Sequence, residues 1–192
     1  MNSELDGKIV LVTGGAGGIG SVISESFAEQ GAKVIVHYKH SKEKAEIIAK
    51  KIKGVAIYAD LTDSEQTKEL FDDIIDKEGK IDICIANAGK YPKDYAPLWE
   101  IGIERWNNTI STNLSLTYNT SRYFLKHVAE TKKGSLVLIG STAGIYGEAG
   151  HADYAAAKGA ITSGLLRTLK NDAAQIGNCL LYTSPSPRDA YV

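Results

Sequence analysis

The sequence has few cysteines, few prolines and no excess of charge of either sign. Only two of its 192 residues are cysteine, and Cys84 lies in the apolar run 81–86, where a thiol behaves as a small hydrophobic group. The 22 Lys and Arg residues nearly balance the 23 Asp and Glu residues, so no strong field attracts nucleic acid or an anionic membrane. These features favour a protein of the reducing cytoplasm with no nucleic acid or membrane partner.

The sequence also lacks a long apolar segment. Residues 1–6 have neither the basic start nor the apolar stretch of a secretory signal, and no apolar run approaches the roughly 18 residues that a membrane span needs. We therefore expect neither export nor membrane anchoring. A chain of 192 residues with 43% hydrophobic content can bury one sizeable core, which favours a single domain.

Short apolar runs alternate with helical patterns along most of the chain. Uniformly apolar runs are typical of parallel strands that are buried on both faces, so the alternation predicts an α/β fold with a doubly wound, Rossmann-type sheet of strand order 3-2-1-4-5. The strands are expected at 8–13, 33–36, 55–58, 81–86 and 135–140, and the helices after residue 20 and at 42–52, 64–77, 104–130 and 153–176.

The composition changes after Gly177. Two of the four prolines fall in the last eight residues, and nothing in this part predicts a sixth strand. The segment 178–192 is similar to the translation of a sequencing adapter. We therefore expect a domain at 1–177 and a tail at 178–192 that is foreign to the natural protein.

A glycine-rich loop follows the first predicted strand and opens the first helix. Gly15, Gly17 and Gly20 match G-x-G-x-x-G, while Gly14, Gly18 and Gly20 match G-x-x-x-G-x-G. Glycines permit the tight turn and the close approach of phosphates, and a helix N-terminus attracts anions. The loop predicts a site for the pyrophosphate of a dinucleotide, with a ligand-free tight turn as the alternative.

The end of the second strand bears on the choice of dinucleotide. An NAD site usually has an Asp or Glu there for the ribose hydroxyls, but residues 37–41 contain no carboxylate. A 2′-phosphate is therefore tolerated, and Lys39 can attract it. The sequence favours NADP(H), and NAD(H) remains an alternative. No metal site is predicted.

Tyr154 and Lys158 are four residues apart, on the same face of a predicted helix. A free tyrosine has a pKa near ~10, and a nearby cation such as Lys158 stabilises the phenolate. Ser141 follows the fifth predicted strand, at the sheet edge where α/β proteins bind ligands, and its hydroxyl can bond a substrate carbonyl. Taken singly, the Tyr and Lys could be a surface pair and Ser141 could merely end its strand.

Taken together, these motifs resemble those of the short-chain dehydrogenase/reductase family, in the single-domain branch of 3-oxoacyl-ACP reductases and glucose or polyol dehydrogenases. The resemblance covers about residues 6–177, and the matching residues are Thr13, Gly14, Gly18, Gly20, Asp60, Asn87, Ala88, Gly89, Asn113, Ser141, Tyr154 and Lys158.

The resemblance implies a role for each of these residues. Tyr154 would be the general acid and base, Ser141 would polarise the carbonyl, and Lys158 would also bind the nicotinamide ribose. Asn113 would hold a water in a proton relay behind Lys158. The remaining cofactor contacts would come from Thr13, Gly14, Gly18, Ile19, Gly20, Lys39, Asp60, Leu61, Asn87, Ala88 and Gly89. His151 is given no role.

The resemblance also implies features that the sequence does not display. Family members continue with sixth and seventh strands and a substrate-covering loop, so we expect an incomplete domain with five strands. A homotetramer or homodimer, formed through the two long helices, is implied as well. The substrate would be a carbonyl or alcohol compound, either a 3-oxoacyl thioester or a sugar or polyol.

Two other functions fit parts of the sequence. A nucleotide-binding module, or a truncated remnant, without turnover would need only the glycine loop. A methyltransferase would need an acidic residue at the end of the second strand, and residues 37–41 provide none.

Overall fold

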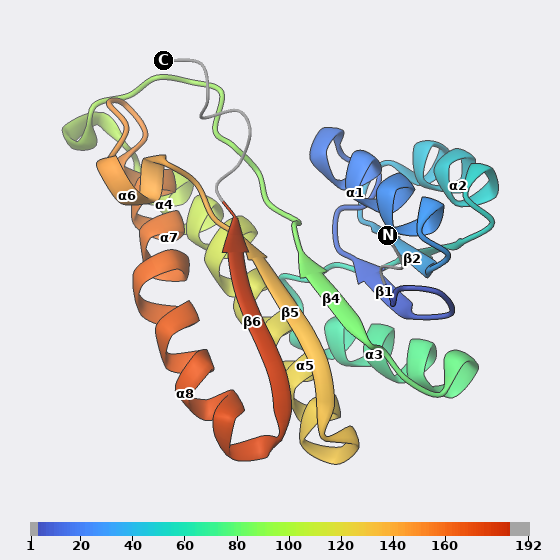
Figure 1. Ribbon diagram of the computed structural model, residues 1–192. Coiled ribbons are helices and arrows are strands. Elements are labelled where there is room, and N and C mark those ends of the chain that lie inside the picture. Colours follow the sequence, from blue (N-terminus) through green and yellow to red (C-terminus); the bar gives the residue numbers. More distant parts are fainter. Residues whose placement is uncertain (1–3, 185–192) are drawn as a thin grey trace.

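The computed structural model describes residues 4–184, without the side chains of residues 178, 183 and 184. Its centre is a parallel sheet of six strands in the order β3-β2-β1-β4-β5-β6 (Figure 1). The strands are β1 (Ile9–Val12), β2 (Lys33–Tyr38), β3 (Val55–Tyr58), β4 (Ile83–Ala86), β5 (Lys133–Ile139) and β6 (Asn178–Ser184). The predicted fold class and the order of the first five strands are confirmed.

Helices cover the sheet on both faces. The described helices are α1 (Gly18–Glu29), α2 (Lys42–Lys51), α3 (Ser64–Glu78), α4 (Ile103–Ile110), α5 (Leu116–Thr131), α6 (Ala143–Tyr146), α7 (Ala152–Gly159) and α8 (Leu166–Ile176). Apolar side chains of α1 and α2 pack on one face, and those of α3, α5 and α8 pack on the other. The chain is therefore doubly wound, as the apolar runs predicted.

The strands at the centre of the sheet show why their sequences are continuously apolar. Val10 and Val12 pack toward α1 and α2, whereas Leu11 between them packs toward the other helical layer. All three are 0% exposed. Each such side chain contributes about 1.5–3 kcal/mol when it is fully buried, so an alternating pattern with polar residues would not fit here.

The two long predicted helices each contain a π-helical turn. The helix predicted at 104–130 consists of α4, the turn η2 (Ser111–Ser115) and α5, and the helix predicted at 153–176 consists of α7, the turn η3 (Ala160–Leu165) and α8. A π-turn changes the helical register locally and is frequent at functional sites. The short helix α6 and the 3-10 turn η1 (Leu98–Glu100) were not predicted.

The prediction of five strands was wrong, because β6 extends the sheet. This strand pairs with β5 in parallel, with Leu136 opposite Leu181. The prediction followed the proline-rich end of the chain and gave no weight to the β-prone run 179–183. An edge strand offers unpaired N–H and C=O groups to any extended segment, so pairing does not depend on the origin of the segment.

The two faces of β6 differ in burial. Leu181 is 7% exposed and joins the core beneath α5 and α8, whereas Leu180 and Tyr182 on the opposite face are 57% and 55% exposed. Residues 185–192 of the predicted tail lie outside the described residues. The foreign origin of 178–192 stays a prediction, which resequencing of the source locus tests. Within the described chain, no helix has the length and apolar character to traverse a membrane.

Candidate active site

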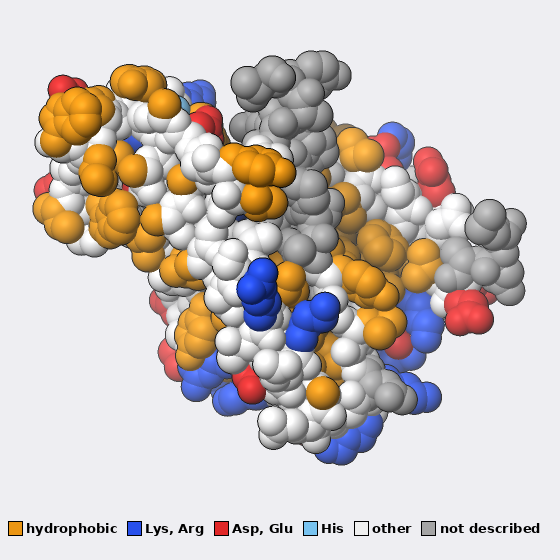
Figure 2. Space-filling view, turned by 60° about the vertical axis from the view of Figure 1, so that its left-hand side comes forward, with side chains coloured by type: hydrophobic (Ala, Val, Ile, Leu, Met, Phe, Trp, Pro, Cys, Tyr) orange, Lys and Arg blue, Asp and Glu red, His pale blue; other side chains and the backbone are white. Residues whose placement is uncertain are grey.

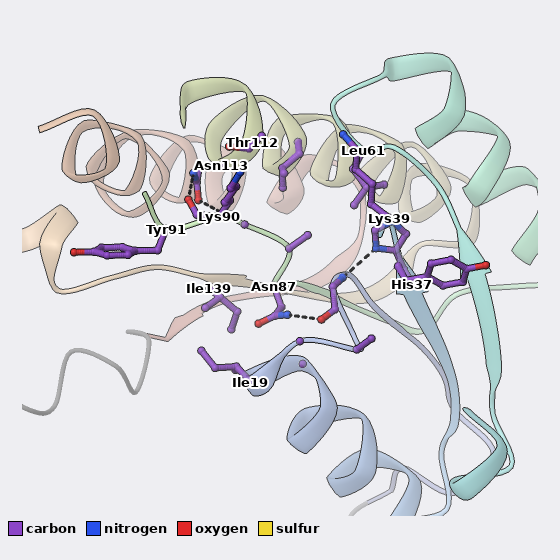
Figure 3. A pocket seen from close by; sticks show the side chains of 18 of the residues that line it. Ile19, His37, Lys39, Leu61, Asn87, Lys90, Tyr91, Thr112, Asn113 and Ile139 are labelled. Carbon is purple, nitrogen blue, oxygen red and sulfur yellow. Dashed lines mark hydrogen bonds between the residues drawn. The ribbon is translucent and has the colours of Figure 1, made fainter. Parts of the chain in front are cut away.

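A cavity of about 930 Å³ lies at the carboxyl end of the strands. Figure 3 shows His37, Lys39 and Leu61 at one end of it, Asn113 and Tyr91 at the other, and Ile19, Asn87 and Ile139 between them. Its lining also includes the glycine loop, Asp60, Glu148, Tyr154 and Lys158. Residues from distant parts of the sequence thus meet at the edge where parallel sheets bind ligands.

The glycine loop has the backbone that the motif predicted. Gly14 has a φ of +60°, and a β-carbon at Gly20 would overlap the carbonyl oxygen of Gly14. Gly18, the first residue of α1, has open space where its β-carbon would be. The first N–H groups of a helix lack intrahelical partners, so this open helix end fits an anionic phosphate group.

His37 supports the glycine loop from below. Its Nδ1 atom accepts a hydrogen bond of 3.0 Å from Gly14 N, and its Nε2 atom lies 3.0 Å from Ala59 O. The residue is 2% exposed, and burial lowers its pKa to about 4. The imidazole is therefore neutral near pH 7, with Nδ1 as the acceptor and Nε2 as the donor. Residue spacing gave no signal for this role.

Thr13 and Asn87 join β1 to β4 beneath the loop. The Thr13 hydroxyl donates to Ile85 O at 3.1 Å and accepts from Asn87 N and Ala88 N, both at 3.0 Å. Asn87 Nδ2 donates to the carbonyl oxygens of Thr13 and Gly14 at 2.9 and 3.2 Å. Thr13 is fully buried, and these hydroxyl contacts shape the cleft from inside the protein.

Lys39 and Asp60 form an ion pair at the far end of the cavity. Their Nζ and Oδ2 atoms are 2.6 Å apart, and Asp60 Oδ1 accepts from Thr62 N and Thr62 Oγ1 at 3.0 and 2.6 Å. Burial alone would raise the pKa of Asp60, but the bonds from Lys39 and Thr62 outweigh it and lower that pKa. Leu61 lies beside them, 2% exposed.

Asn113 lies in the π-turn η2 and is 0% exposed. Its side chain accepts from Lys90 N at 3.2 Å and donates to Lys90 O at 2.9 Å, as Figure 3 shows. A β-carbon at Gly89 would lie 2.8 Å from Asn113 Oδ1 and 3.7 Å from Lys158 Nζ. Both side chains therefore lie where a side chain of residue 89 would project, and a larger residue there would not fit.

Tyr154 and Lys158 lie on α7, 8% and 5% exposed. Lys158 Nζ donates to Ile139 O at 2.8 Å and lies 5.8 Å from the centre of the Tyr154 ring. A buried ammonium group beside a phenol favours the phenolate form. The spacing of four residues thus places both groups on the cavity wall, as predicted from the helix.

Ser141 follows β5 and is 1% exposed, with its Oγ accepting from Ala143 N at 3.2 Å. Two glycines bring this segment to α7. A β-carbon at Gly144 would lie 2.5 Å from Gly159 N, and one at Gly159 would lie 3.0 Å from Gly144 O. This close approach places the segment after Ser141 against the helix turn of Lys158.

Tyr91, Glu148 and His151 form a group beside Tyr154 to which the sequence gave no role. The Tyr91 hydroxyl donates to Glu148 Oε1 at 2.5 Å, and its ring packs edge-on against the Tyr154 ring with centroids 5.0 Å apart. His151 stacks on the other side, 4.7 Å from Tyr91.

Arg105 on α4 fastens this region to α7. Its Nε donates to Asp153 Oδ2 at 3.0 Å, and its Nη1 and Nη2 donate to Asp94 O and Gly150 O at 2.7 and 3.2 Å. Thr109 also donates to Asp153 Oδ2, at 2.8 Å. Burial opposes ionisation of Asp153, but the bonds from Arg105 and Thr109 outweigh it and lower its pKa.

The site thus combines a glycine loop at a helix N-terminus with a phenol and its neighbouring ammonium group. The structure brings Gly14, Gly18, Ile19, Gly20, Lys39, Asp60, Leu61, Asn87, Ala88, Gly89, Asn113, Tyr154 and Lys158 to one cavity lining. Thr13 and Ser141 are not part of this lining, and both are buried.

Comparison with known proteins agrees with this geometry. The model of the short chain dehydrogenase family matches residues 8–180. The chain is 34% identical over 176 residues to a 3-oxoacyl-[acyl-carrier-protein] reductase of Thermotoga maritima, covering 89% of this chain and 70% of that protein. It is 36% identical over 166 residues to versicolorin reductase 1 of Aspergillus parasiticus, covering 83% of this chain and 62% of the relative.

A third relative, the hydroxynaphthalene reductase arp2 of Aspergillus fumigatus, is 34% identical over 178 residues, with 90% of this chain and 63% of the relative covered. The chain thus spans about two thirds of the length of these reductases. The family model covers far more than half of the chain, together with the glycine loop, Ser141, Tyr154 and Lys158. The chain therefore belongs to the short-chain dehydrogenase family.

Proposed function

We propose that the protein is an oxidoreductase that transfers a hydride between NADP(H) and a carbonyl compound or its secondary alcohol. The observation that carries this proposal is one cavity lined both by the glycine loop and by Tyr154 with Lys158. The names of the three relatives, all reductases, support it. A nicotinamide cofactor, when bound, supplies or accepts the hydride.

The chain's own residues provide the proton and the orientation. In reduction, the Tyr154 hydroxyl donates a proton to the carbonyl oxygen while the hydride is added to the carbonyl carbon; in oxidation the phenolate takes the proton back. Lys158 stabilises the phenolate and binds the ribose, and Ser141 holds the carbonyl oxygen by a hydrogen bond. Asn113 holds a water behind Lys158, and both side chains lie near Gly89.

We infer that the cofactor is NADP(H). Lys39 lines the cavity beyond β2, and its side chain is 35% exposed in the ion pair with Asp60. In our proposal this ammonium group binds the phosphate on the adenosine ribose. Asp60 and Leu61 contact the adenine in this arrangement. The glycine loop and the start of α1 hold the pyrophosphate, and Asn87, Ala88 and Gly89 form the floor.

We also infer that the protein works in the cytoplasm as a homo-oligomer, a tetramer or a dimer. The proposed contact surface is formed by α5 and α8. Tyr118 on α5 is 48% exposed, which supports an apolar contact there. Light scattering measures the mass of the assembly, and a monomer at micromolar concentration would contradict this part of the proposal.

Replacing Tyr154 by Phe tests the proposed reaction. The variant keeps the ring and its packing but loses the proton, so kcat for NADPH-dependent carbonyl reduction is expected to fall by about two orders of magnitude or more. The affinity for NADPH, measured by fluorescence, is expected to stay nearly unchanged. Equal turnover in the variant would contradict the role of Tyr154, and cofactor binding without any turnover in the parent would favour a nucleotide-binding module.

A further inference from the structure

The substrate end of the cavity contains a carboxylate that the reaction does not use. Glu148 lines the cavity together with Tyr91, Tyr154 and Lys158, and its side chain is 35% exposed. The Tyr91 hydroxyl donates to Glu148 Oε1 at 2.5 Å. The Tyr91 ring also contacts the ring of Tyr154, the proposed proton donor. Tyr91 thus connects Glu148 to Tyr154.

Tyr91 is held in place on both sides. The backbone of Lys90 is bound by Asn113 through two hydrogen bonds of 3.2 and 2.9 Å, and Asp94 O accepts from Arg105 at 2.7 Å. Ala96 N donates to Gly150 O at 3.1 Å, which connects the same loop to the segment of Glu148. The Glu148 carboxylate is thus part of a fixed wall of the cavity, formed by Tyr91, Glu148 and His151. It is not an independent surface side chain.

His151 forms the back of this wall. Its ring stacks on Tyr91, and its Nδ1 atom lies 3.1 Å from Ala149 O and 3.9 Å from Glu148 Oε1. Its buried Nε2 atom has no hydrogen-bond partner in the described chain. The lysines at this end of the cavity are Lys90 and Lys158, and the ammonium group of Lys158 donates to Ile139 O.

A carboxylate accepts hydrogen bonds and cannot donate them. A substrate hydroxyl beside the carbonyl group can therefore donate to Glu148, whereas a substrate carboxylate in that place is repelled by it. The wall thus discriminates between substrates by the group that lies next to the carbonyl.

We propose that Glu148 is a specificity-determining residue, which selects carbonyl compounds with a neighbouring hydroxyl group and disfavours those with a neighbouring carboxylate. This inference rests on the proposed function, because it assigns the substrate class of the same site. The test substrates are hydroxyacetone, butanone and pyruvate, which place a hydroxyl oxygen, a methyl carbon and a carboxylate oxygen two bonds from the carbonyl carbon.

Steady-state kcat/KM is measured for the three compounds with NADPH, in the parent chain, Glu148→Met and Glu148→Gln. The parent is expected to prefer hydroxyacetone to butanone about tenfold and to prefer butanone to pyruvate about tenfold. In Glu148→Met the preference for the hydroxyl disappears. In Glu148→Gln the discrimination against pyruvate falls about tenfold while butanone changes less than about twofold.

Glu104→Gln is the matched control, because Glu104 is exposed on the first turn of α4 and does not line the cavity. It is expected to keep the parental ratios. Unchanged ratios in both Glu148 variants would overturn the inference and leave the proposed function intact. The inference would also be overturned if Glu104→Gln changed the kcat/KM ratios as much as the Glu148 variants do. The loss of any negative charge near the site would then explain the change.

Binding provides a readout that does not need turnover. Calorimetry measures the affinity of the NADPH-bound chain for propane-1,2-diol and for lactate. These are the alcohols that correspond to hydroxyacetone and pyruvate. The inference is supported if the parent binds the diol more tightly than lactate and Glu148→Met loses this preference. The inference would then hold even if no carbonyl is reduced, because the absence of reduction would overturn only the proposed function. Equal binding of both alcohols in the parent would overturn the inference.

Discussion

At the scale of single residues, His37 shows how burial converts a titratable side chain into a structural one. It is held between Gly14 N and Ala59 O, and its role as acceptor requires the neutral ring. A charged ring could not accept the bond from the glycine loop. Protonation of this histidine is therefore coupled to the shape of the glycine loop.

This coupling predicts a pH dependence of stability. The pKa of His37 is lowered from 6.5 to about 4, so the unfolded chain binds this proton more readily than the folded chain. The contribution to stability is complete above pH ~6.5 and is lost as the pH falls toward about 4. It amounts to about 3 kcal/mol, since one pKa unit corresponds to ~1.4 kcal/mol.

Urea unfolding at pH 7 and pH 4.5 measures this effect. In His37→Asn, whose amide oxygen can accept from Gly14 N, the loss of stability between the two pH values is expected to be smaller than in the parent by about 2 kcal/mol. His40→Gln, at an exposed neighbouring histidine, serves as the control. A parental pH dependence in His37→Asn would show that other groups dominate acid unfolding.

At the scale of elements, the site depends on how α4, α6 and α7 are joined. Gly144 on α6 and Gly159 on α7 let the two helices touch at backbone distance. Arg105 and Thr109, one turn apart on α4, both bind Asp153 at the start of α7. These contacts hold Tyr154 and the loop that carries Tyr91 in one arrangement.

The ion pair of Arg105 and Asp153 gives a prediction at this scale. The side chain of Asp153 is 0% exposed, so Arg105→Met leaves a buried carboxylate without its cation and is expected to destabilise the fold by about 3 kcal/mol. The double variant Arg105→Met/Asp153→Asn removes the uncompensated charge as well. It is expected to recover more than half of the loss, as measured by urea unfolding.

A loss below about 0.5 kcal/mol in Arg105→Met would mean that the pair behaves as a surface salt bridge. Lys68→Met is the matched control, since its partner Asp72 is exposed and the pair lies on the outer surface of α3. Little effect is expected for this substitution.

At the scale of the whole molecule, exposed hydrophobic side chains gather near the substrate end. Leu98, Trp99, Ile103, Ile145 and Tyr146 are 57–84% exposed. Figure 2 shows orange side chains gathered at its upper left, toward the end of the molecule where α4 and α6 lie in Figure 1. These exposed side chains thus lie on the elements around the substrate end, away from the buried centre of the sheet.

Thermal unfolding tests fold and cofactor preference together. A ligand present at ~100 times its Kd stabilises the native state by about 2.7 kcal/mol, which raises Tm by several degrees for a chain of this size. We expect a larger rise with NADPH than with NADH, and we expect Lys39→Gln to remove the difference. An equal rise in Tm with both cofactors in the parent would contradict the preference for NADP(H). Thermal unfolding without a cooperative transition would mean that these 192 residues do not fold as an independent domain.

The sequence alone determined the features that depend on short spacings. Apolar runs defined five strands, the glycines defined the phosphate loop, and a spacing of four residues placed Tyr154 and Lys158 on one helix face, because these patterns reflect local backbone geometry. The tertiary structure alone decided what depends on contacts between distant segments. It placed His37 under Gly14, Arg105 on Asp153 and Tyr91 on Glu148. It also decided that β6 forms. The open edge of β5 offered a hydrogen-bonding partner to the β-prone run 179–183, and the presence of that partner cannot be seen in the sequence of the run itself.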